Sequence, residues 1–216
     1  KSTLNENNCN TAFTTVCKPR TSIHLYRQEE WFKVFIHETF HCLGLDFSSL
    51  NQYACKHIIF SIFPLKIDLR LYECYTETFS EIIQLLFLTS ELHDTDHKIL
   101  VEFKKELINL QKFSFFQCAK ILDYYHLKVE DLHKPQTLYK ENTAVFSYYI
   151  LKSMMLFHID DFLNWCSQDN GSIQFLNTQK NLENFCLFIK NTLESKNQRV
   201  YNAIIEETTP LYQKTT

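Results

Sequence analysis

One short segment, residues 35–46, constrains this chain more than any other. It contains an H-E-x-x-H motif formed by His37, Glu38 and His41. Residues four apart in a helix lie one turn above each other on the same face, so the two imidazoles can point to one site with the glutamate beside them. Apolar residues recur around the motif at helical spacing, which predicts a largely buried helix over residues 28–43.

Two histidines and a glutamate on a buried helix need polar partners, because burying them without partners is costly. A metal ion is one such partner. H-E-x-x-H is the pattern of zinc hydrolases, in which both histidines bind the ion and the glutamate acts on water as a general base. The competing interpretation is a buried helix whose histidines are hydrogen-bonded core residues. Gly44 stands where a left-handed C-cap would end the helix.

The scarcity of glycine and proline predicts long helices. The 216 residues include two glycines and four prolines, which argues against a sandwich or barrel rich in tight turns. We therefore predict a mainly α (α+β) fold, a zincin-like helical domain with a short edge strand or small sheet before the motif helix. Residues 1–20 are predicted to be a flexible lead-in and residues 21–216 a single domain.

Periodicity and capping residues predict the individual elements. Residues 21–26 alternate and are rich in strand formers, so they are predicted to form a strand. Further helices are predicted over residues 48–63, 72–89, 94–110, 114–126, 142–165, 178–193 and 198–207, with a turn at 170–171.

Charge, hydropathy and cysteine usage exclude several classes of partner. The net charge of −3 gives no indication of a nucleic-acid surface, and the longest apolar runs are far shorter than the ~20 residues that span a bilayer. The eight cysteines are scattered without a C-x-x-C pair, so we interpret most of them as free thiols of an intracellular, cytoplasmic protein. Cys9 and Cys17 fit that interpretation least well.

Two histidines alone do not hold zinc, so a third protein ligand is expected. One large class of zinc hydrolases places it just after the motif helix, in the pattern H-E-x-x-H-x-x-G-x-x-H/D. Gly44 matches that pattern, but the ligand position holds Phe47, which cannot bind a metal. Asp46 stands one residue too early for a ligand. It is expected to support the site by accepting a hydrogen bond from a ligand histidine.

A second helix offers better candidates, because Glu77 and Glu81 lie four residues apart on one face. One carboxylate can bind the metal while the other accepts the N–H of a ligand histidine. Glu73 is the rival ligand, and Glu77 would then take the supporting position. The same polar stripe is also typical of an ordinary surface helix.

Residues 76–81, Thr-Glu-Thr-Phe-Ser-Glu, resemble the N-E-x-x-(S/A)-(D/E) segment of the gluzincin zinc peptidases. The resemblance covers this helix and the H-E-x-x-H helix, and the asparagine is replaced by Thr76. It implies one Zn²⁺ per chain, bound by His37, His41 and Glu77. It further implies Glu38 as the general base.

An oxyanion formed during hydrolysis needs a donor besides the metal, and gluzincins use a downstream tyrosine or histidine. Tyr148 and Tyr149 are the candidates, although tyrosines of an aromatic-rich helix are commonly core residues. The strand at 21–26 can align a peptide by backbone pairing. Arg20, Arg27 and Arg70 flank these elements, and an arginine would suit the C-terminal carboxylate of a carboxypeptidase substrate.

Together these features predict an intracellular zinc-dependent metallopeptidase that acts on a peptide or protein substrate. The chain is also similar to uncharacterised H-E-x-x-H proteins of large DNA viruses, which implies a viral origin. Two alternatives stay open: a non-enzymatic helical interaction domain with a degenerate or coincidental motif, and a zinc hydrolase that acts on a non-peptide amide. The sequence leaves the oligomeric state open.

Overall fold

Helices dominate the computed structural model, which describes residues 3–5, 12–15 and 20–213. Eight α-helices lie in this described part: α2 (Trp31–Leu43), α3 (Tyr53–Ile62), α4 (Leu71–Leu92), α5 (Asp96–Tyr124), α6 (Lys152–Phe157), α7 (Ile159–Trp165), α8 (Gln179–Leu193) and α9 (Gln198–Gln213). One antiparallel sheet of two short strands, β1 (Ala12–Thr14) and β2 (Ile23–Leu25), precedes them. The predicted mainly helical class with a small sheet before the motif helix is therefore confirmed.

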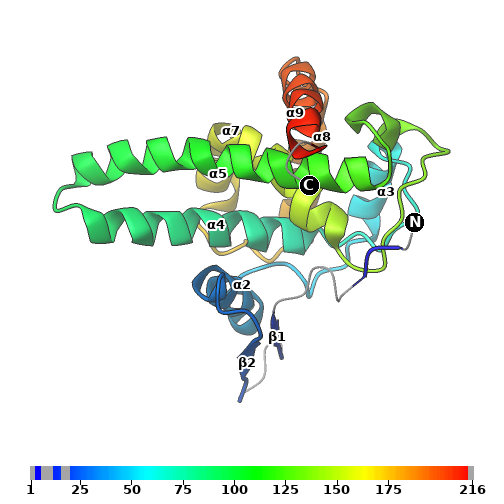
Figure 1. Cartoon of the computed structure of the whole chain (residues 1–216). Coiled ribbons are helices and arrows are strands. Elements are labelled where there is room, and N and C mark those ends of the chain that lie inside the picture. The colour runs from blue at the N-terminus through cyan, green and yellow to red at the C-terminus, as the bar shows by residue number, and fades with distance from the viewer. Residues whose placement is uncertain (1–2, 6–11, 16–19, 214–216) are drawn as a thin grey trace.

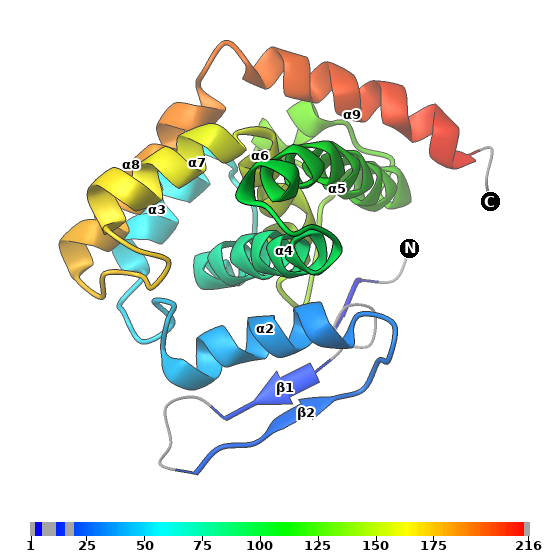
Figure 2. The ribbon, with the colours of Figure 1, turned by 90° about the vertical axis from the view of Figure 1, so that its left-hand side faces the viewer.

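The long helices α4 and α5 form an antiparallel hairpin through the centre of the molecule (Figure 1). Helix α2 packs on α4, and the sheet lies against the opposite side of α2. Helices α3, α7 and α8 gather at one end of α4, and α9 crosses α5 (Figure 2). The motif helix is thus held between the sheet and the α4–α5 hairpin.

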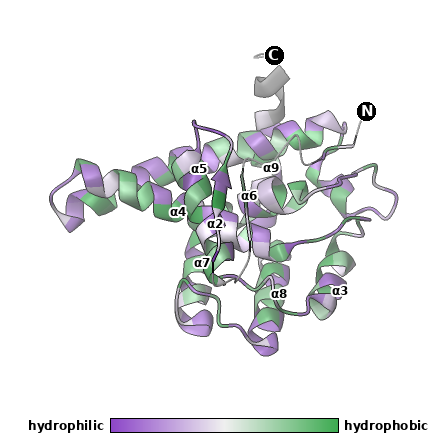
Figure 3. Cartoon of the chain, turned by 90° about the horizontal axis from the view of Figure 1, so that it is seen from below, coloured by the Kyte–Doolittle hydropathy of each residue, from purple (hydrophilic) through white to green (hydrophobic). Residues whose placement is uncertain are grey.

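The outer part of the α4–α5 hairpin projects beyond the rest of the molecule, and it mixes hydrophobic with hydrophilic residues (Figure 3). Large apolar side chains are exposed there, among them Leu86, Leu88 and Leu92 of α4 and Leu100 and Val101 of α5. Nevertheless, no helix in the described part of the chain combines the length and hydropathy required to cross a membrane.

The sheet is only partly as predicted. Strand β2 lies within the predicted strand 21–26, and Leu25 pairs with Ala12 of β1. Strand β1 was not predicted, because three residues carry too little alternation to be recognised. It lies within the predicted lead-in 1–20, most of which falls outside the described residues.

Helix α2 ends as predicted, at a left-handed glycine. Gly44 has φ 63° and ψ 38°, a conformation that costs glycine little because it lacks a Cβ. The Gly44 N–H donates to the carbonyl of His41, and the Leu45 N–H donates to the carbonyl of Phe40. These two bonds form a Schellman motif, which ends the helix directly after the H-E-x-x-H residues.

Several predicted helices differ from the structure only at their ends, such as α3, which begins at Tyr53 and not at residue 48, but two predictions differ in the number of helices. The helices expected at 94–110 and 114–126 are one continuous helix, α5, since residues 111–113 contain neither glycine nor proline to interrupt it. The single helix expected at 142–165 is divided into the π-helical segment Phe146–Leu151, α6 and α7. Single π-helical turns are frequent at functional sites, and this one carries both candidate tyrosines.

The start of this π-helical segment is held by Glu141. Its Oε2 accepts hydrogen bonds from the hydroxyl of Tyr139 (2.7 Å) and from the backbone N–H of Phe146 (2.6 Å). Burial raises the pKa of Glu141 to about 7, and the charge of Asp68 adds to this increase. The two hydrogen bonds and the charge of Arg70 lower the pKa, but by less.

The prediction that the cysteines are free is wrong for one pair. Cys55 of α3 and Cys186 of α8 form a disulfide, which joins helices that lie 131 residues apart in the chain. The sequence did not indicate this pair because the two cysteines meet only through the packing of α3 on α8. Four cysteines are free thiols: Cys42, Cys74, Cys118 and Cys166. Cys9 and Cys17 lie outside the described residues.

Candidate metal centre

The two histidines of the motif lie one turn apart on α2, as their spacing predicts. Their ring centroids are 4.8 Å apart, and Nε2 of His37 lies 3.0 Å from Nε2 of His41. Both residues are buried, being 7% and 8% exposed. Helix α2 turns this face towards α4, so the opposing helix can complete the site.

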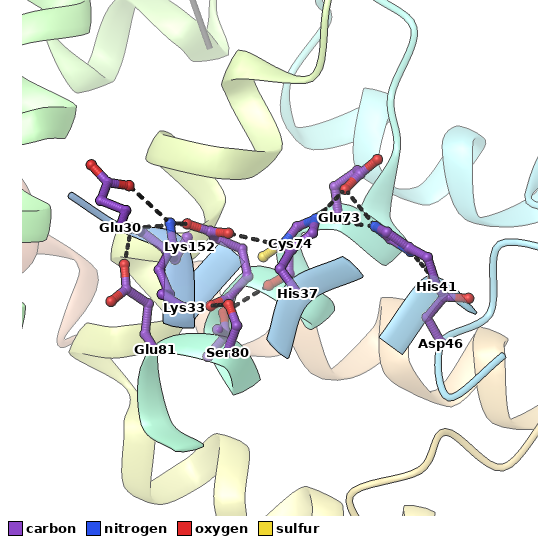
Figure 4. A network of polar contacts seen from close by, with 12 residues as sticks. Glu30, Lys33, His37, His41, Asp46, Glu73, Cys74, Ser80, Glu81 and Lys152 are labelled. Carbon is purple, nitrogen blue, oxygen red and sulfur yellow. Dashed lines mark hydrogen bonds and ion pairs between the residues drawn. The ribbon is translucent and has the colours of Figure 1, made fainter. Parts of the chain in front are cut away.

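Glu73, in the first turn of α4, is the third member of the cluster (Figure 4). Its Oε2 lies 3.2 Å from Nε2 of His37 and 3.2 Å from Nε2 of His41. His37, His41 and Glu73 are the one group in the described part of the chain whose donor atoms are close enough together to hold a metal ion.

Each histidine also binds a carboxylate through its other ring nitrogen. Nδ1 of His37 lies 2.9 Å from Oε2 of Glu77, and Nδ1 of His41 is hydrogen-bonded to Oδ2 of Asp46. Oδ1 of Asp46 accepts from the backbone N–H and from the hydroxyl of Ser48, at 3.0 and 2.8 Å. A carboxylate on Nδ1 keeps the proton there and leaves the lone pair on Nε2 for a metal.

The two Nε2 atoms and the carboxylate oxygen therefore converge on one position, which suits a metal ion or, without a metal, the protons that the raised pKa values of both histidines keep there. Two neutral Nε2 atoms and a carboxylate oxygen repel each other at 3.0–3.2 Å unless a cation lies among them. Donor atoms held at about 2.0–2.2 Å by a tetrahedral zinc ion are about 3.3–3.6 Å apart. The observed triangle fits such an ion after a displacement of a few tenths of an ångström.

The electrostatics of the cluster favour positive charge. Burial lowers the pKa of His41, but the hydrogen bonds to Asp46 and Glu73 outweigh it and raise the pKa to about 10. Burial raises the pKa of Glu73, but His37 and His41 outweigh it and lower the pKa to about 2. Because the same carboxylates would favour a divalent cation, the donor set and its surroundings both suit a metal.

Glu77 does not have the position expected of a ligand. Both of its oxygens are occupied: Oε2 binds Nδ1 of His37, and Oε1 lies 2.6 Å from Nζ of Lys33. Glu81 does not contact a histidine, and its Oε1 accepts from Nζ of Lys152 at 3.0 Å. The structure therefore matches the alternative in which Glu73 takes the ligand position and Glu77 supports His37.

Lys33 and Lys152 were not predicted to belong to the site. They form a cluster with Glu77 and Glu81 on one side of His37 (Figure 4). Lys152 is 1% exposed, and its Nζ also lies 3.8 Å from Oε1 of Glu77. A signal was present: Lys152 interrupts a run of apolar residues, and a lysine in such a run needs an acidic partner when it is buried.

Glu38 has the surroundings expected of a general base. It is 8% exposed and lines the same cavity as the three metal-binding candidates. No hydrogen bond or ion pair joins its carboxylate to another described residue. Burial raises the pKa of Glu38, although the two histidines act in the opposite direction. A buried, unpaired carboxylate is suited to accept a proton from a water molecule.

Of the two candidate tyrosines, Tyr148 lies closer to the histidines. Its ring centroid is 6.0 Å from that of His37, and burial together with the charge of Glu73 raises its pKa well above the usual range. The phenol is therefore a hydrogen bond donor at any physiological pH. Tyr149 lies next to Lys152, whose Nζ is 6.0 Å from the centre of its ring.

A cavity of about 960 Å³ contains these side chains. It is lined by residues of α2 and α4, by the two tyrosines, by all of β1 and by part of α5 around Gln117. A volume of this size accommodates a short peptide or a ligand of similar size.

Comparison with protein-family models, with curated proteins and with solved structures gave no match for this chain. Its chemistry is therefore inferred from its own residues.

Proposed function

We propose that the chain is a zinc-dependent hydrolase of peptide bonds, with a site of the gluzincin type. One observation carries the proposal: Nε2 of His37, Nε2 of His41 and Oε2 of Glu73 converge at 3.0–3.2 Å while carboxylates hold both Nδ1 atoms. In this proposal the gluzincin pattern falls on Glu73 and Glu77, one helical turn earlier than the sequence suggested.

In this proposal the ligands are His37, His41 and Glu73, and the supporting carboxylates are Glu77 and Asp46. When bound, zinc supplies a Lewis acid that polarises the substrate carbonyl and lowers the pKa of water towards ~7.

The other steps belong to the chain itself. Glu38 takes the proton of the attacking water and passes it to the leaving amine. The hydroxyl of Tyr148 donates a hydrogen bond to the oxyanion that develops on the carbonyl. The peptide is the favoured substrate because the cavity is large and is lined by all three residues of β1, a strand with which an extended chain can pair.

The metal is tested first, by elemental analysis of the purified protein. We expect about one zinc per chain, removed by a chelator and restored by zinc addition. His37→Ala and Glu73→Gln should abolish stoichiometric binding, since each removes a ligand. His57→Ala, which changes an exposed histidine of α3, is the matched control and should keep full zinc content.

Turnover is tested next, with a peptide library and Glu38→Gln. This variant should keep its zinc and lose about 10²–10⁴-fold in rate, since it lacks the general base. Stoichiometric zinc with no cleavage of any peptide by the wild type would refute the peptidase proposal. A parallel assay on non-peptide amides would then separate another amide hydrolase from a non-enzymatic domain.

A further inference from the structure

The cavity extends along α2 and is lined by five lysine and arginine residues, of which Arg27, before the start of α2, is exposed. Towards the start of α2 lie Lys33 and Lys152, both of which are paired with buried glutamates. Lys120, on α5, also has an interaction partner. Arg70 lies at the other end, where Ser48 and Tyr72 complete the lining.

Only the Nε group of the Arg70 guanidinium makes a hydrogen bond with a described residue. Its Nε donates to Oδ2 of Asp68 at 3.0 Å, and the other oxygen of Asp68 accepts from Lys56 at 3.1 Å. Among the described residues, no other hydrogen bond or ion pair involves its side chain. The side chain is 38% exposed, and Arg70 lines the cavity.

The position of Arg70 relates it directly to the metal centre. It immediately precedes α4, and its carbonyl accepts the backbone N–H of Glu73 at 3.1 Å, so the two residues lie one turn apart. Tyr148, the expected oxyanion donor, lines the same cavity. Three residues of helix rise about 4.5 Å, roughly the span of one to two residues of an extended peptide.

We propose that Arg70 forms a subsite for a carboxylate of the substrate, one or two residues from the bond that is cleaved. This inference rests on the proposed function. The two Nη groups form the fork that binds a carboxylate through two parallel hydrogen bonds, while Asp68 holds the guanidinium in place. The carboxylate belongs either to the free C-terminus of the peptide or to an Asp or Glu side chain.

Three acetylated peptides of one sequence, chosen from the library digest, test the subsite. The first has a free C-terminal carboxylate, the second a C-terminal amide, and the third a C-terminal amide with glutamate as its last residue. We expect kcat/KM for one of the charged peptides to exceed that of the neutral amide by about 10–100-fold, the usual effect of a hydrogen bond to a charged group. The peptide that is preferred identifies the source of the carboxylate.

Variants assign the preference to Arg70. Arg70→Ala should reduce the ratio between charged and neutral peptides to near one, with the zinc content unchanged. Arg70→Lys should restore part of the ratio, since it keeps the charge without the fork. Arg27→Ala is the matched control, because Arg27 is an exposed arginine that lines the same cavity before the start of α2. It should leave the ratio intact.

Binding separates this inference from the proposed function. The same peptides are titrated into zinc-loaded Glu38→Gln protein, with and without Arg70→Ala, and their Kd values are compared. Absence of cleavage by the wild type would refute the peptidase proposal, but a 10–100-fold preference in Kd that depends on Arg70 would still support the subsite. Equal Kd values for charged and neutral peptides, failure of all three to bind, or a preference that survives Arg70→Ala would overturn it.

Discussion

The buried lysine at position 152 allows a quantitative test of the charge network behind the metal centre. Lys152 is 1% exposed, and its Nζ lies 3.0 Å from Glu81 and 3.8 Å from Glu77. Lys152→Met keeps the aliphatic volume but leaves Glu81 without its cation in a site where both carboxylates are buried. Removal of one partner from a buried ion pair costs about 3–5 kcal/mol.

The free energy of unfolding of a domain is about 5–15 kcal/mol, so this cost is a large part of it. Urea unfolding followed by circular dichroism should therefore detect the loss. Lys152→Met combined with Glu81→Gln should recover more than half of the loss, because the uncompensated charge is then removed as well. Lys104→Met, at an exposed position of α5, is the control and should change stability by less than about 0.5 kcal/mol. A loss below about 1 kcal/mol for Lys152→Met, or no recovery in the double variant, would refute the reasoning.

Three further predictions concern the metal centre, the π-helical segment and the disulfide. Asp46→Asn should weaken zinc binding by about 10–100-fold in a competition titration, since the charge that orients His41 is lost. Glu141, whose pKa of about 7 lies above its value of about 4.5 in the unfolded chain, should stabilise the fold below pH 4.5 and lose this effect as the pH rises through 7. Stability should therefore fall by up to about 3 kcal/mol over that window, and unfolding of Glu141→Gln should lack this component. Reduction of the Cys55–Cys186 disulfide should cost about 4–5 kcal/mol by the chain-entropy estimate, measured as a lower urea midpoint that a Cys55→Ala/Cys186→Ala variant reproduces without reductant.

Local features of the fold could be predicted because they depend on neighbours in the chain. The H-E-x-x-H spacing placed His37 and His41 on one face of a helix, and Gly44 ended that helix in the structure as its conformational freedom predicted. Strand β1 and the Cys55–Cys186 disulfide were missed since both depend on residues that meet only in the folded chain.

The third member of the candidate metal centre was harder to predict for a specific geometric reason. Glu73, Glu77 and Glu81 recur every four residues, so all three lie on the same face of α4 and differ by one turn each. A shift of about 6 Å between α2 and α4 exchanges one for the next, and nothing in either helix alone determines that shift. In the structure, the packing of α4 on α2 brings Glu73 to both Nε2 atoms.

The polar groups of the cavity divide into a part that is satisfied by the chain and a part that is not. Lys33 with Glu77, and Lys152 with Glu81, neutralise one another as buried pairs and need nothing from outside. Beside them, the Nε2 atoms of His37 and His41 and the carboxylate of Glu73 lie 3.0–3.2 Å apart and need a cation among them, either a proton or a metal ion. No hydrogen bond joins the carboxylate of Glu38 to another described residue. A purely structural network would be expected to satisfy its own buried groups, because each unpaired one costs stability. The groups that need a cation or can accept a proton from water are the H-E-x-x-H residues and the glutamate that faces them, which supports a role in binding a metal ion and activating water.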